Sequence, residues 1–568
     1  MLRALAALLL IGAAAQDRPG PATVAGLAPE ASAGRGARVP FVTIEAEDAR
    51  FTGALLRAER SFGELAAEAS GRRAVRLTGD QGVGFVLPVA VDALTVRYAI
   101  PDSADGRGID STLGVYAGGE RIGELALTSR YGWYYGRYPF TKRPADGGAH
   151  HFYDHARLKL GRVLPAGTLV TLRREAGDPA EWTVIDLADF ERVPAPRAMP
   201  AGAVSVLGFG ADPSGARSSL VAFRAAIARG QRTRQPVWIP PGTYRIDGHL
   251  TVDRVALIGA GHWYSVLAGA GVGIFGQNSR DVTLSGFAIL GEVTRRIDKA
   301  QTQGVGGAFS NSTISDLWIQ HTKVGLWLDG PMDRLTVRRV RVYDQAADGL
   351  NFHRGVTNSL VEDGFFRGLG DDGLAMWSEG QENRGNVFRR NTVIAPSLAN
   401  GIALYGGRDL SLEDNLVADT LTQGGGYHLG SRFKATPFAG TIRLDGNMAV
   451  RSGSMDPNWR FGVGALWFYA LDRPMTGAAF AVRDTVLVDS SYEAVQFLGK
   501  AIDGMTIDGL SIANAGAAAF LLQAPGEATA RNVAARGLGD AGVLDAGRGF
   551  RLTDGGGNRG WDRRAPFP

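Results

Sequence analysis

The chain has 568 residues, of which 45% are apolar and 21% charged, enough to build a large core and more than one domain. Lysines and arginines number 61 and acidic residues 57, so the net charge of +4 is small for this length and favours neither nucleic acid nor an acidic membrane surface as a partner. The chain contains no cysteine, so its stability must come from burial and backbone pairing rather than from disulfides.

The N-terminal sequence MLRALAALLLIGAAAQ has a positive charge at Arg3, an apolar run that ends at Ile11, and small residues up to Ala15. These features are typical of a secretory signal peptide, and the apolar run is shorter than the roughly 20 residues that span a bilayer. We therefore expect cleavage of residues 1–15, secretion to the extracellular space or periplasm, and no membrane contact afterwards. Residues 16–40, rich in Pro, Gly and Ala, are predicted to form a flexible lead-in.

Two domains are predicted after the lead-in. Short runs of alternating polarity between Gly, Asp and Pro indicate a β-sandwich of jelly-roll type over residues 41–193. Residues 194–203, which begin PAPRAMPAG, have the composition of a linker. Residues 204–568 contain one amphipathic helix near 216–230 and then short β runs almost throughout. The helix is expected to cover an end where unpaired strand edges would invite aggregation.

The β runs of the second domain repeat. Each unit ends in a glycine followed by Leu or Ile, and these glycines are Gly325, Gly349, Gly373 and Gly401, at spacings of 24, 24 and 28 residues. Periods in this range mark a solenoid. The leucine and asparagine pattern of leucine-rich repeats is missing, so we predict a right-handed parallel β-helix, with on the order of 14 rungs. The predicted fold class is all-β, a β-sandwich followed by a β-helix. The stretch from FGADPSG to IPPGTYRI resembles the entry segment of pectin-lyase-like β-helix proteins.

The repeat places three aspartates together. Asp348 precedes Gly349 as Asp372 precedes Gly373, so the two belong to one column on successive rungs, roughly 4.8 Å apart, with Asp371 beside them. Carboxylates crowded in this way have raised pKa values, so one can donate a proton while its neighbours accept. Glycoside hydrolysis needs that division of roles. We expect Asp371 to be the general acid and Asp348 and Asp372 to hold and deprotonate the water, which implies inversion.

The strands that leave these turns carry side chains suited to holding a sugar ring. They are Asn351, His353, Trp377 and Tyr405.

The stretches ADGLNFHRG and GDDGLAMWS resemble the catalytic region of glycoside hydrolase family 87, the mycodextranases and α-1,3-glucanases. The resemblance implies catalysis by Asp348, Asp371 and Asp372 on a β-helix, with inversion and without a cofactor. The implied function is secreted endo-hydrolysis of an α-glucan, either α-1,3-glucan or nigeran. We expect a monomer, because a β-helix that is capped at its ends needs no partner.

Three alternatives stay open. One is a polysaccharide lyase, for which Arg354 or Lys323 could serve. The second is a polygalacturonase-like hydrolase of uronate polymers. The third is a non-catalytic glycan-binding β-helix.

The front domain carries a second resemblance. TIEAEDA, ALTVRYAIPD and VIDLADFERV resemble carbohydrate-binding modules of families 6 and 35, which often hold a structural calcium. The resemblance implies Glu47 and Asp186, with Glu45, as ligands, and hard oxygen donors suit calcium.

Two further stretches of the front domain have distinctive composition. The aromatic residues of SRYGWYYGRYPF, 129–140, could stack on sugars or pack the domain on the β-helix. The spacing of His150, His151, Asp154 and His155 fits no strong zinc pattern, so we predict no metal site there.

Overall fold

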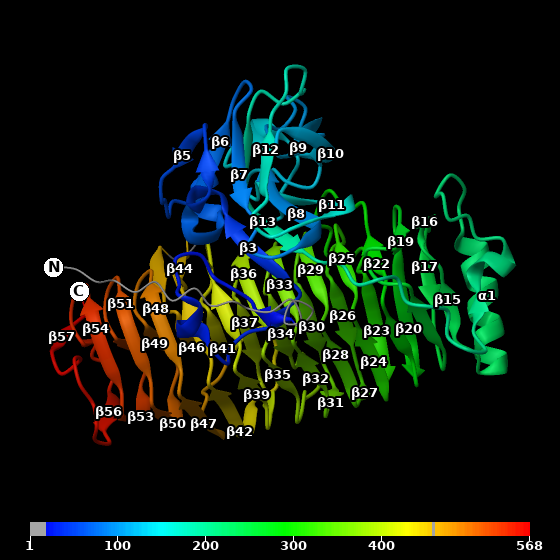
Figure 1. Ribbon diagram of the computed structural model, residues 1–568. Helices are drawn as coiled ribbons and strands as arrows, with labels where there is room; N and C mark the ends of the chain where they lie inside the picture. Colours follow the sequence, from blue (N-terminus) through cyan, green and yellow to red (C-terminus); the bar gives the residue numbers. More distant parts are fainter. Residues whose placement is uncertain (1–18, 457–459, 568) are drawn as a thin grey trace, which may run out of the picture.

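The computed structural model describes residues 19–456 and 460–567. It contains a long parallel β-solenoid of about 13 turns with a smaller antiparallel β-sandwich seated on one side (Figure 1). Helix α1 (Leu220–Thr233) covers one end of the solenoid, as the sequence predicts. The predicted signal peptide, residues 1–15, lies outside the described residues.

Two antiparallel sheets make the sandwich, and its strands run from Phe41 to Glu191. The first sheet has the order β10 (Glu120–Thr128), β9 (Asp110–Ala117), β12 (Leu169–Arg173), β7 (Gly82–Val86), β4 (Arg50–Phe51). The second has the order β11 (Asp154–Leu164), β8 (Val91–Ala99), β13 (Thr183–Glu191), β6 (Ala74–Leu77), β5 (Ala54–Leu56), with β3 (Phe41–Glu45) also paired to β13. Their facing sides enclose an apolar core.

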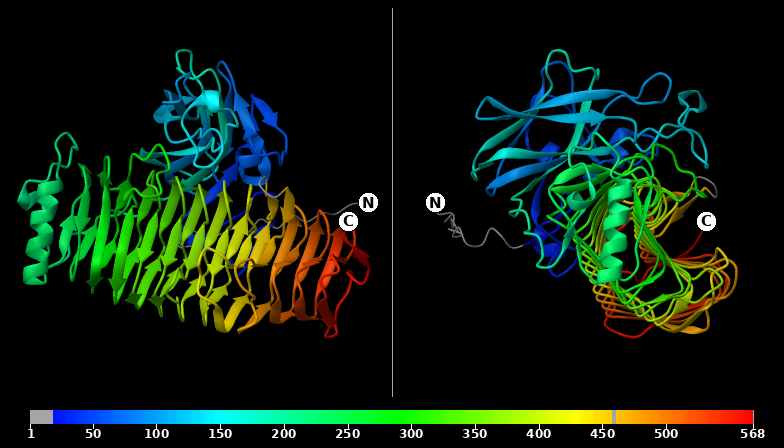
Figure 2. Two further views of the ribbon diagram at one scale, coloured as in Figure 1. Left: turned by 180° about the vertical axis from the view of Figure 1, so that it is seen from behind. Right: turned by 90° about the vertical axis from the view of Figure 1, so that its right-hand side faces the viewer.

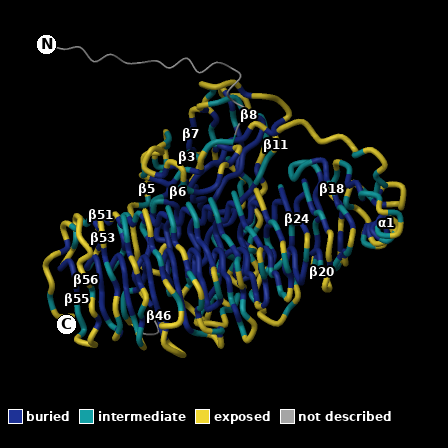
Figure 3. The backbone as a smooth tube through the Cα atoms, turned by 90° about the horizontal axis from the view of Figure 1, so that it is seen from below, coloured by how far each residue is buried: buried dark blue, intermediate teal, exposed yellow. Residues whose placement is uncertain are grey.

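Three parallel sheets make the solenoid. Sheet A has 15 strands and begins with β14 (Val204–Ser205), and sheet B has 12 and begins with β16 (Gly242–Arg245). Sheet C has 13 strands and begins with β17 (His249–Thr251). Inward-facing Leu, Ile, Val and Phe side chains of all three sheets form one continuous buried core. In Figure 3 the backbone of most solenoid strands is coloured dark blue, which marks buried residues. Because the chain has no cysteine, this buried core stabilises the solenoid without disulfides.

The repeated glycines are explained by the close approach of neighbouring turns. A Cβ atom at Gly349 would collide with the carbonyl oxygen of Gly373, and one at Gly373 with that of Gly401. Buried asparagines fix the same stacking at another corner, where Asn415 donates its backbone N–H to Oδ1 of Asn447 at 3.0 Å and accepts one from Asn391 at 2.9 Å. Each asparagine thus satisfies backbone groups that the corner would otherwise leave unpaired.

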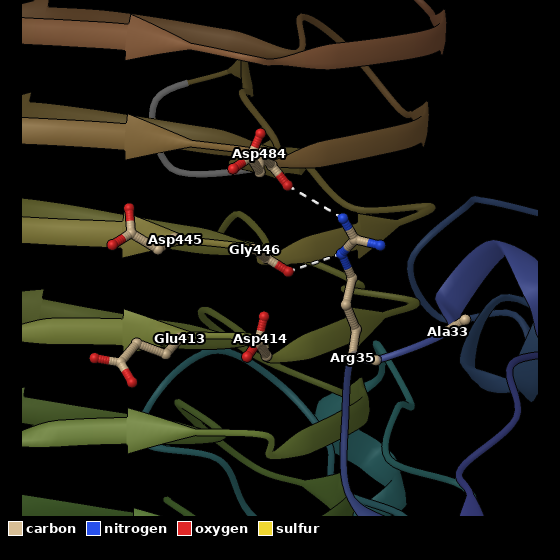
Figure 4. Close-up of a pocket in the computed structure, with 8 residues that line it drawn as sticks. Ala33, Arg35, Glu413, Asp414, Asp445, Gly446 and Asp484 are labelled. Carbon is tan, nitrogen blue, oxygen red and sulfur yellow. Dashed lines mark hydrogen bonds between the residues drawn. The ribbon is translucent and has the colours of Figure 1, made fainter.

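The prediction of a flexible lead-in is wrong for residues 19–40. Strand β1 (Gly20–Pro21) pairs with β2 (Arg38–Val39), and the small apolar side chains of this segment are buried against sheet B. Arg35 extends along the solenoid surface and donates hydrogen bonds to the carbonyl oxygens of Gly446, at 2.7 Å, and Asp484, at 3.2 Å (Figure 4). The segment has no helical or strand period, but burial of its alanines and valines outweighs its intrinsic flexibility.

The sandwich is joined to sheet B by buried ion pairs. Arg341 of β29 (Arg341–Gln345) donates to both carboxylate oxygens of Glu191 at 2.7 and 2.8 Å. Arg367 of β33 (Phe365–Leu369) lies 2.8 Å from Asp189. The views in Figure 2 show the sandwich held against one side of the coil. Such bidentate contacts fix the relative orientation of the two domains.

Candidate active site

The three predicted catalytic aspartates lie in two successive turns between sheet B and sheet C. Asp348 follows β29 and precedes β30 (Leu350–His353), and Asp371 and Asp372 follow β33 and precede β34 (Leu374–Trp377). The backbone N–H of Gly349 donates to the carbonyl oxygen of Asp372 at 3.1 Å. The structure therefore stacks Asp348 under Asp372, with Asp371 next to them, as the repeat predicts.

Asp348 and Asp372 are buried and held by hydrogen bonds. The side-chain amide of Asn351 donates to Oδ2 of Asp348 at 2.7 Å. Oδ1 of Asp372 accepts from the backbone N–H and the side-chain amide of Asn400, both at 2.9 Å, and Oδ2 accepts from the Tyr405 hydroxyl at 2.9 Å. These donors fix both carboxyl groups in place.

Burial and mutual repulsion change the protonation of this pair. Burial, and then the charges of Asp371 and Asp372, raise the pKa of Asp348 well above its usual range. Burial and the charge of Asp371 raise the pKa of Asp372 to about 7, although its hydrogen bonds from Asn400 and Tyr405 act in the opposite direction. Asp348 and Asp372 therefore hold a proton between them under mildly acidic conditions.

Asp371 differs from its neighbours in exposure and in partner. Its side chain is 23% exposed, and its Oδ2 atom lies 2.6 Å from Nη1 of Arg296. Arg296 belongs to the irregular segment 291–304, which joins β22 (Ala288–Leu290) to β23 (Val305–Ser310). Sequence reasoning missed this arginine, because the segment interrupts the repeat and offers no spacing from which its position can be inferred.

The predicted sugar-binding residues lie around the acids, and two of them contact the acids directly. The Asn351 side chain hydrogen-bonds to Asp348, and the Tyr405 hydroxyl hydrogen-bonds to Asp372. Both residues therefore orient a carboxyl group of the site. His353 is buried, with its ring nitrogens 3.0 Å from Asp329 and 3.1 Å from Glu379.

Trp377 lies one turn beyond His353 in sheet C, and its indole N–H donates to the carbonyl oxygen of Phe433 at 3.0 Å. The Trp327 and Phe433 rings flank it, each with its centroid 6.4 Å away. Phe433 is 48% exposed. Sequence reasoning missed Trp327 and Phe433, although Trp327 lies on the same face of sheet C as Asn351.

The aromatic stretch 129–140 packs against the solenoid beside the acids. The ring of Tyr131 stacks on that of His321 with centroids 3.5 Å apart. Tyr138 hydrogen-bonds to Asp298, and the guanidinium of Arg296 lies 5.3 Å from its ring centroid. Of the two uses that the sequence left open for this stretch, packing on the β-helix is confirmed.

The carboxylates predicted to bind calcium are brought together inside the sandwich. Glu45 accepts a hydrogen bond from the Ser70 hydroxyl at 3.0 Å, and Asp186 is paired with Arg97 at 2.6 Å. Glu45 Oε2 and both carboxylate oxygens of Glu47 are buried and without a hydrogen-bond partner among the described residues. Burial and the charge of Asp186 raise the pKa of Glu45 well above its usual value and that of Glu47 to about 8. Buried carboxyl oxygens without a partner are the donors that a hard cation prefers, and such a cation would bind in place of the protons that burial favours.

Among the described residues one cluster has the distances of a metal site, and it does not include the predicted calcium ligands. Ligand atoms of Asp154, His321 and Asp344 lie within 4.8 Å of one another at the junction between the sandwich and sheet B. They are already bonded, since His321 Nε2 lies 2.6 Å from Asp154 and His155 Nδ1 lies 2.8 Å from Asp344. Of the four residues whose spacing fits no zinc pattern, only Asp154 belongs to this cluster.

A parallel β-solenoid that presents three carboxyl groups at one turn column, two of them with raised pKa values, is a glycoside hydrolase scaffold. Residues 38–193 match the family description "Alpha-1,3-glucanase catalytic domain D1", and residues 216–519 match "Alpha-1,3-glucanase catalytic domain D2". The chain belongs to the α-1,3-glucanases of glycoside hydrolase family 87. The front domain is thus part of the catalytic unit, while its likeness to carbohydrate-binding modules stays a prediction.

Solved structures give the same result. The catalytic unit of a thermostable GH87 α-1,3-glucanase from Streptomyces thermodiastaticus strain HF3-3 is 43% identical, with a TM-score of 0.86, over 93% of this chain and 98% of that one. The Agl-KA catalytic domain is 25% identical, with a TM-score of 0.86, over 92% and 99% of the two chains. A GH87 α-1,3-glucanase catalytic domain in complex with nigerose shares the fold at 24% identity and a TM-score of 0.83, over 93% and 100%. A search of curated proteins found no match.

Proposed function

We propose that this glycoside hydrolase cleaves α-1,3-linked glucan, either α-1,3-glucan or nigeran, at internal bonds and with inversion. The observation that carries the proposal is the division among the three aspartates. Asp348 and Asp372 are buried and stacked, whereas Asp371 is the acid that remains 23% exposed beside them. The structure of a related GH87 catalytic domain in complex with nigerose supports this class of substrate.

Each aspartate has a role that its surroundings suit. Asp371 faces outward, so its carboxyl group can protonate the oxygen of the departing sugar. Asp348 and Asp372 lie on successive turns, where both can hydrogen-bond one water, and the ionised member of the pair removes its proton as it attacks the anomeric carbon. Asn351, Asn400 and Tyr405 orient the two carboxyl groups, and Trp377 offers an aromatic surface for a neighbouring sugar ring.

Reducing-sugar release from α-1,3-glucan and from nigeran tests the proposal. The mature protein should release reducing ends from at least one of them, and Asp371→Asn, which keeps the shape but removes the titratable proton, should abolish release. Asp363→Asn is the matched control, because Asp363 is a turn aspartate paired with Arg390, away from the acids. NMR of the first product formed should show the β-anomer. A folded parent that releases nothing from either glucan would refute the substrate assignment.

The lyase alternative is weakened by the positions of its candidate bases. The Lys323 ammonium donates to the carbonyl oxygen of Asp298 at 2.7 Å, and Arg354 is paired with Asp329 at 3.0 Å. Both are engaged in structural contacts. Ultraviolet absorbance from an unsaturated product would nevertheless identify elimination directly.

We also propose that the protein is secreted as a monomer after loss of residues 1–15 and that Glu45, Glu47 and Asp186 hold a structural calcium. Bound calcium would neutralise the buried carboxylates and hold β3 and β13 together. Mass measurement of the exported protein tests the cleavage, and light scattering tests the oligomeric state. The described residues contain no helix long and apolar enough to cross a membrane.

A further inference from the structure

Arg296 is the one described cation that forms an ion pair with a catalytic aspartate. Its Nη1 atom lies 2.6 Å from Oδ2 of Asp371 and 3.4 Å from the carbonyl oxygen of Gly370. Its side chain is only 15% exposed. The arginine therefore covers the carboxylate that the proposed mechanism needs as a proton donor.

Contacts from both domains hold Arg296 in this position. Its Nε atom donates to Asp298 at 2.8 Å. Tyr138, from the sandwich, hydrogen-bonds to the same carboxylate and lies under the guanidinium. The Lys323 ammonium group, from the solenoid, donates a hydrogen bond to the carbonyl oxygen of Asp298 at 2.7 Å and so holds the same segment. The arginine thus sits on a segment clamped between the sandwich and the solenoid.

Acidic and phenolic groups also interact with Asp371, and Lys323 interacts with Asp348 and with Arg296 itself. The acidic and phenolic groups come from each element packed around Asp371: Asp348 from the preceding turn, Asp372 from its own turn, Tyr138 from the sandwich and Tyr405 from β37 (Ile402–Tyr405). Arg296 is the cation that is paired with Asp371 beside these groups. A carboxylate held in an ion pair cannot protonate a leaving oxygen, so this pair has to open for the reaction.

We propose that Arg296 is a positioning residue that holds Asp371 in place in the free enzyme and releases it to the glycosidic oxygen when a glucan chain binds, with Tyr138 of the sandwich as its clamp. This inference rests on the proposed role of Asp371 as general acid. Sugar hydroxyls are the groups that replace Asp371 as hydrogen-bond acceptors for the guanidinium. Once the arginine has withdrawn, Asp371 is left beside Asp348 and Asp372, takes up a proton from the buffered solvent and gives that proton to the departing glycosidic oxygen.

The release has a kinetic signature. The limb of kcat/KM that Asp371 sets reports the free enzyme, in which Asp371 is paired with Arg296, whereas the corresponding limb of kcat reports the enzyme–substrate complex. In the parent the limb of kcat should therefore lie at the higher pH. In Arg296→Gln the pair is absent in both states, so the limb of kcat/KM should move up, by about 1–3 pH units, and coincide with that of kcat.

The experiment measures both profiles on a soluble α-1,3-linked tetrasaccharide. Arg296→Lys should restore much of the parental separation, because it keeps the charge. Tyr138→Phe should shift the limb in the same direction as Arg296→Gln but by less, because it removes the bond to Asp298 and keeps the ring. Arg295→Gln is the matched control, since Arg295 is the exposed arginine one position earlier, and it should leave both limbs unchanged.

Two results would overturn the inference. The first is an Arg296→Gln enzyme whose profiles match those of the parent. The second is a crystal structure of Asp372→Asn with the tetrasaccharide bound in which Arg296 still pairs with Asp371. Failure of the proposed function gives a different result, because Asp371→Asn would then retain activity whatever Arg296 does. An inactive Asp371→Asn with an unshifted Arg296→Gln profile would reject the role of Arg296 alone.

Discussion

The hydroxyl of Tyr405 donates a hydrogen bond to Oδ2 of Asp372 at 2.9 Å from the following turn of the solenoid. This bond favours the ionised carboxyl and so opposes the effects of burial and of Asp371, which raise the pKa of Asp372 to about 7. The contact gives Tyr405 an influence on the proposed base through the Asp372 carboxyl group.

Tyr405→Phe should therefore raise the pKa of Asp372 further. The limb of kcat/KM that the ionisation of Asp372 sets should therefore move to higher pH, by about one to two units for the loss of a hydrogen bond to a charged group. Tyr469→Phe, further along the same face of sheet C, is the control and should keep the parental limb. A Tyr405→Phe profile equal to that of the parent would show that Asp372 does not act as the base.

Asp372→Asn should stabilise the protein, and the gain should depend on pH. The folded-state pKa of Asp372 lies above its ordinary value, so the parent loses stability as pH rises from about 4 towards 7, where the folded state must give up a proton that burial favours. Each pKa unit corresponds to about 1.4 kcal/mol, so the gain should be small near pH 4 and a few kcal/mol near pH 8.

Urea unfolding at pH 4.5, 6 and 7.5 measures this gain. Asp363→Asn, at an ion-paired surface turn, should show no such widening with pH. A constant difference between Asp372→Asn and the parent across this range would mean that the Asp372 carboxyl titrates normally in the folded protein.

The solenoid and the positions of its catalytic aspartates could be predicted because the repeat can be recognised from the spacing of glycines in the sequence. Gly349 and Gly373 occupy positions where any side chain would collide with the next turn, so they mark the period, and the period then aligns Asp348 with Asp372. Arg296 and Phe433 could not be predicted in the same way. They lie in irregular segments between strands, whose paths depend on tertiary contacts such as the one from Tyr138 to Asp298.

The structure of the lead-in could not be predicted from its own sequence either. Residues 20–39 have the composition of a loop, yet Ala22, Val24 and Ala37 are buried. Their burial depends on an apolar outer surface of sheet B, where Trp318 and Tyr343 lie. That surface is about 300 residues away in the chain, so the sequence of the lead-in alone does not indicate that its side chains will be buried.

The junction between the domains should be a major source of stability. Arg341→Ala leaves the Glu191 carboxylate buried with a single remaining side-chain donor, Trp263, at 3.1 Å. Removing one partner of a buried ion pair costs about 3–5 kcal/mol, so the loss in unfolding free energy should fall in that range.

Denaturant unfolding of the whole chain measures that loss. Arg338→Ala, at an exposed position on β28 (Leu335–Arg338), should cost less than about 0.5 kcal/mol. The double variant Glu191→Gln with Arg341→Met should recover much of the loss, because it leaves no buried charge unpaired. A loss for Arg341→Ala no larger than that of the surface control would mean that the pair does not hold the domains together.

Calcium removal should destabilise the sandwich, and the effect should grow with pH. Glu47 has a pKa of about 8 because it is buried beside Asp186, and calcium binds the ionised carboxylates. Protons and calcium therefore compete, and the rise in Tm on adding calcium to chelator-treated protein should be larger at pH 8 than at pH 6. Glu45→Gln with Glu47→Gln should remove the response and raise the Tm of the calcium-free protein, since two buried like charges are gone.

Asp154→Asn is the control for this experiment, because Asp154 belongs to the cluster at the domain junction that has the distances of a metal site. If calcium acts at the sandwich carboxylates, Asp154→Asn should keep the full calcium response while the Glu45 and Glu47 variant loses it. The reverse pattern would place the cation at the junction with the solenoid. A Tm unaffected by chelator and by calcium at both pH values would mean that Arg97 and Arg73 alone neutralise the carboxylates of the sandwich.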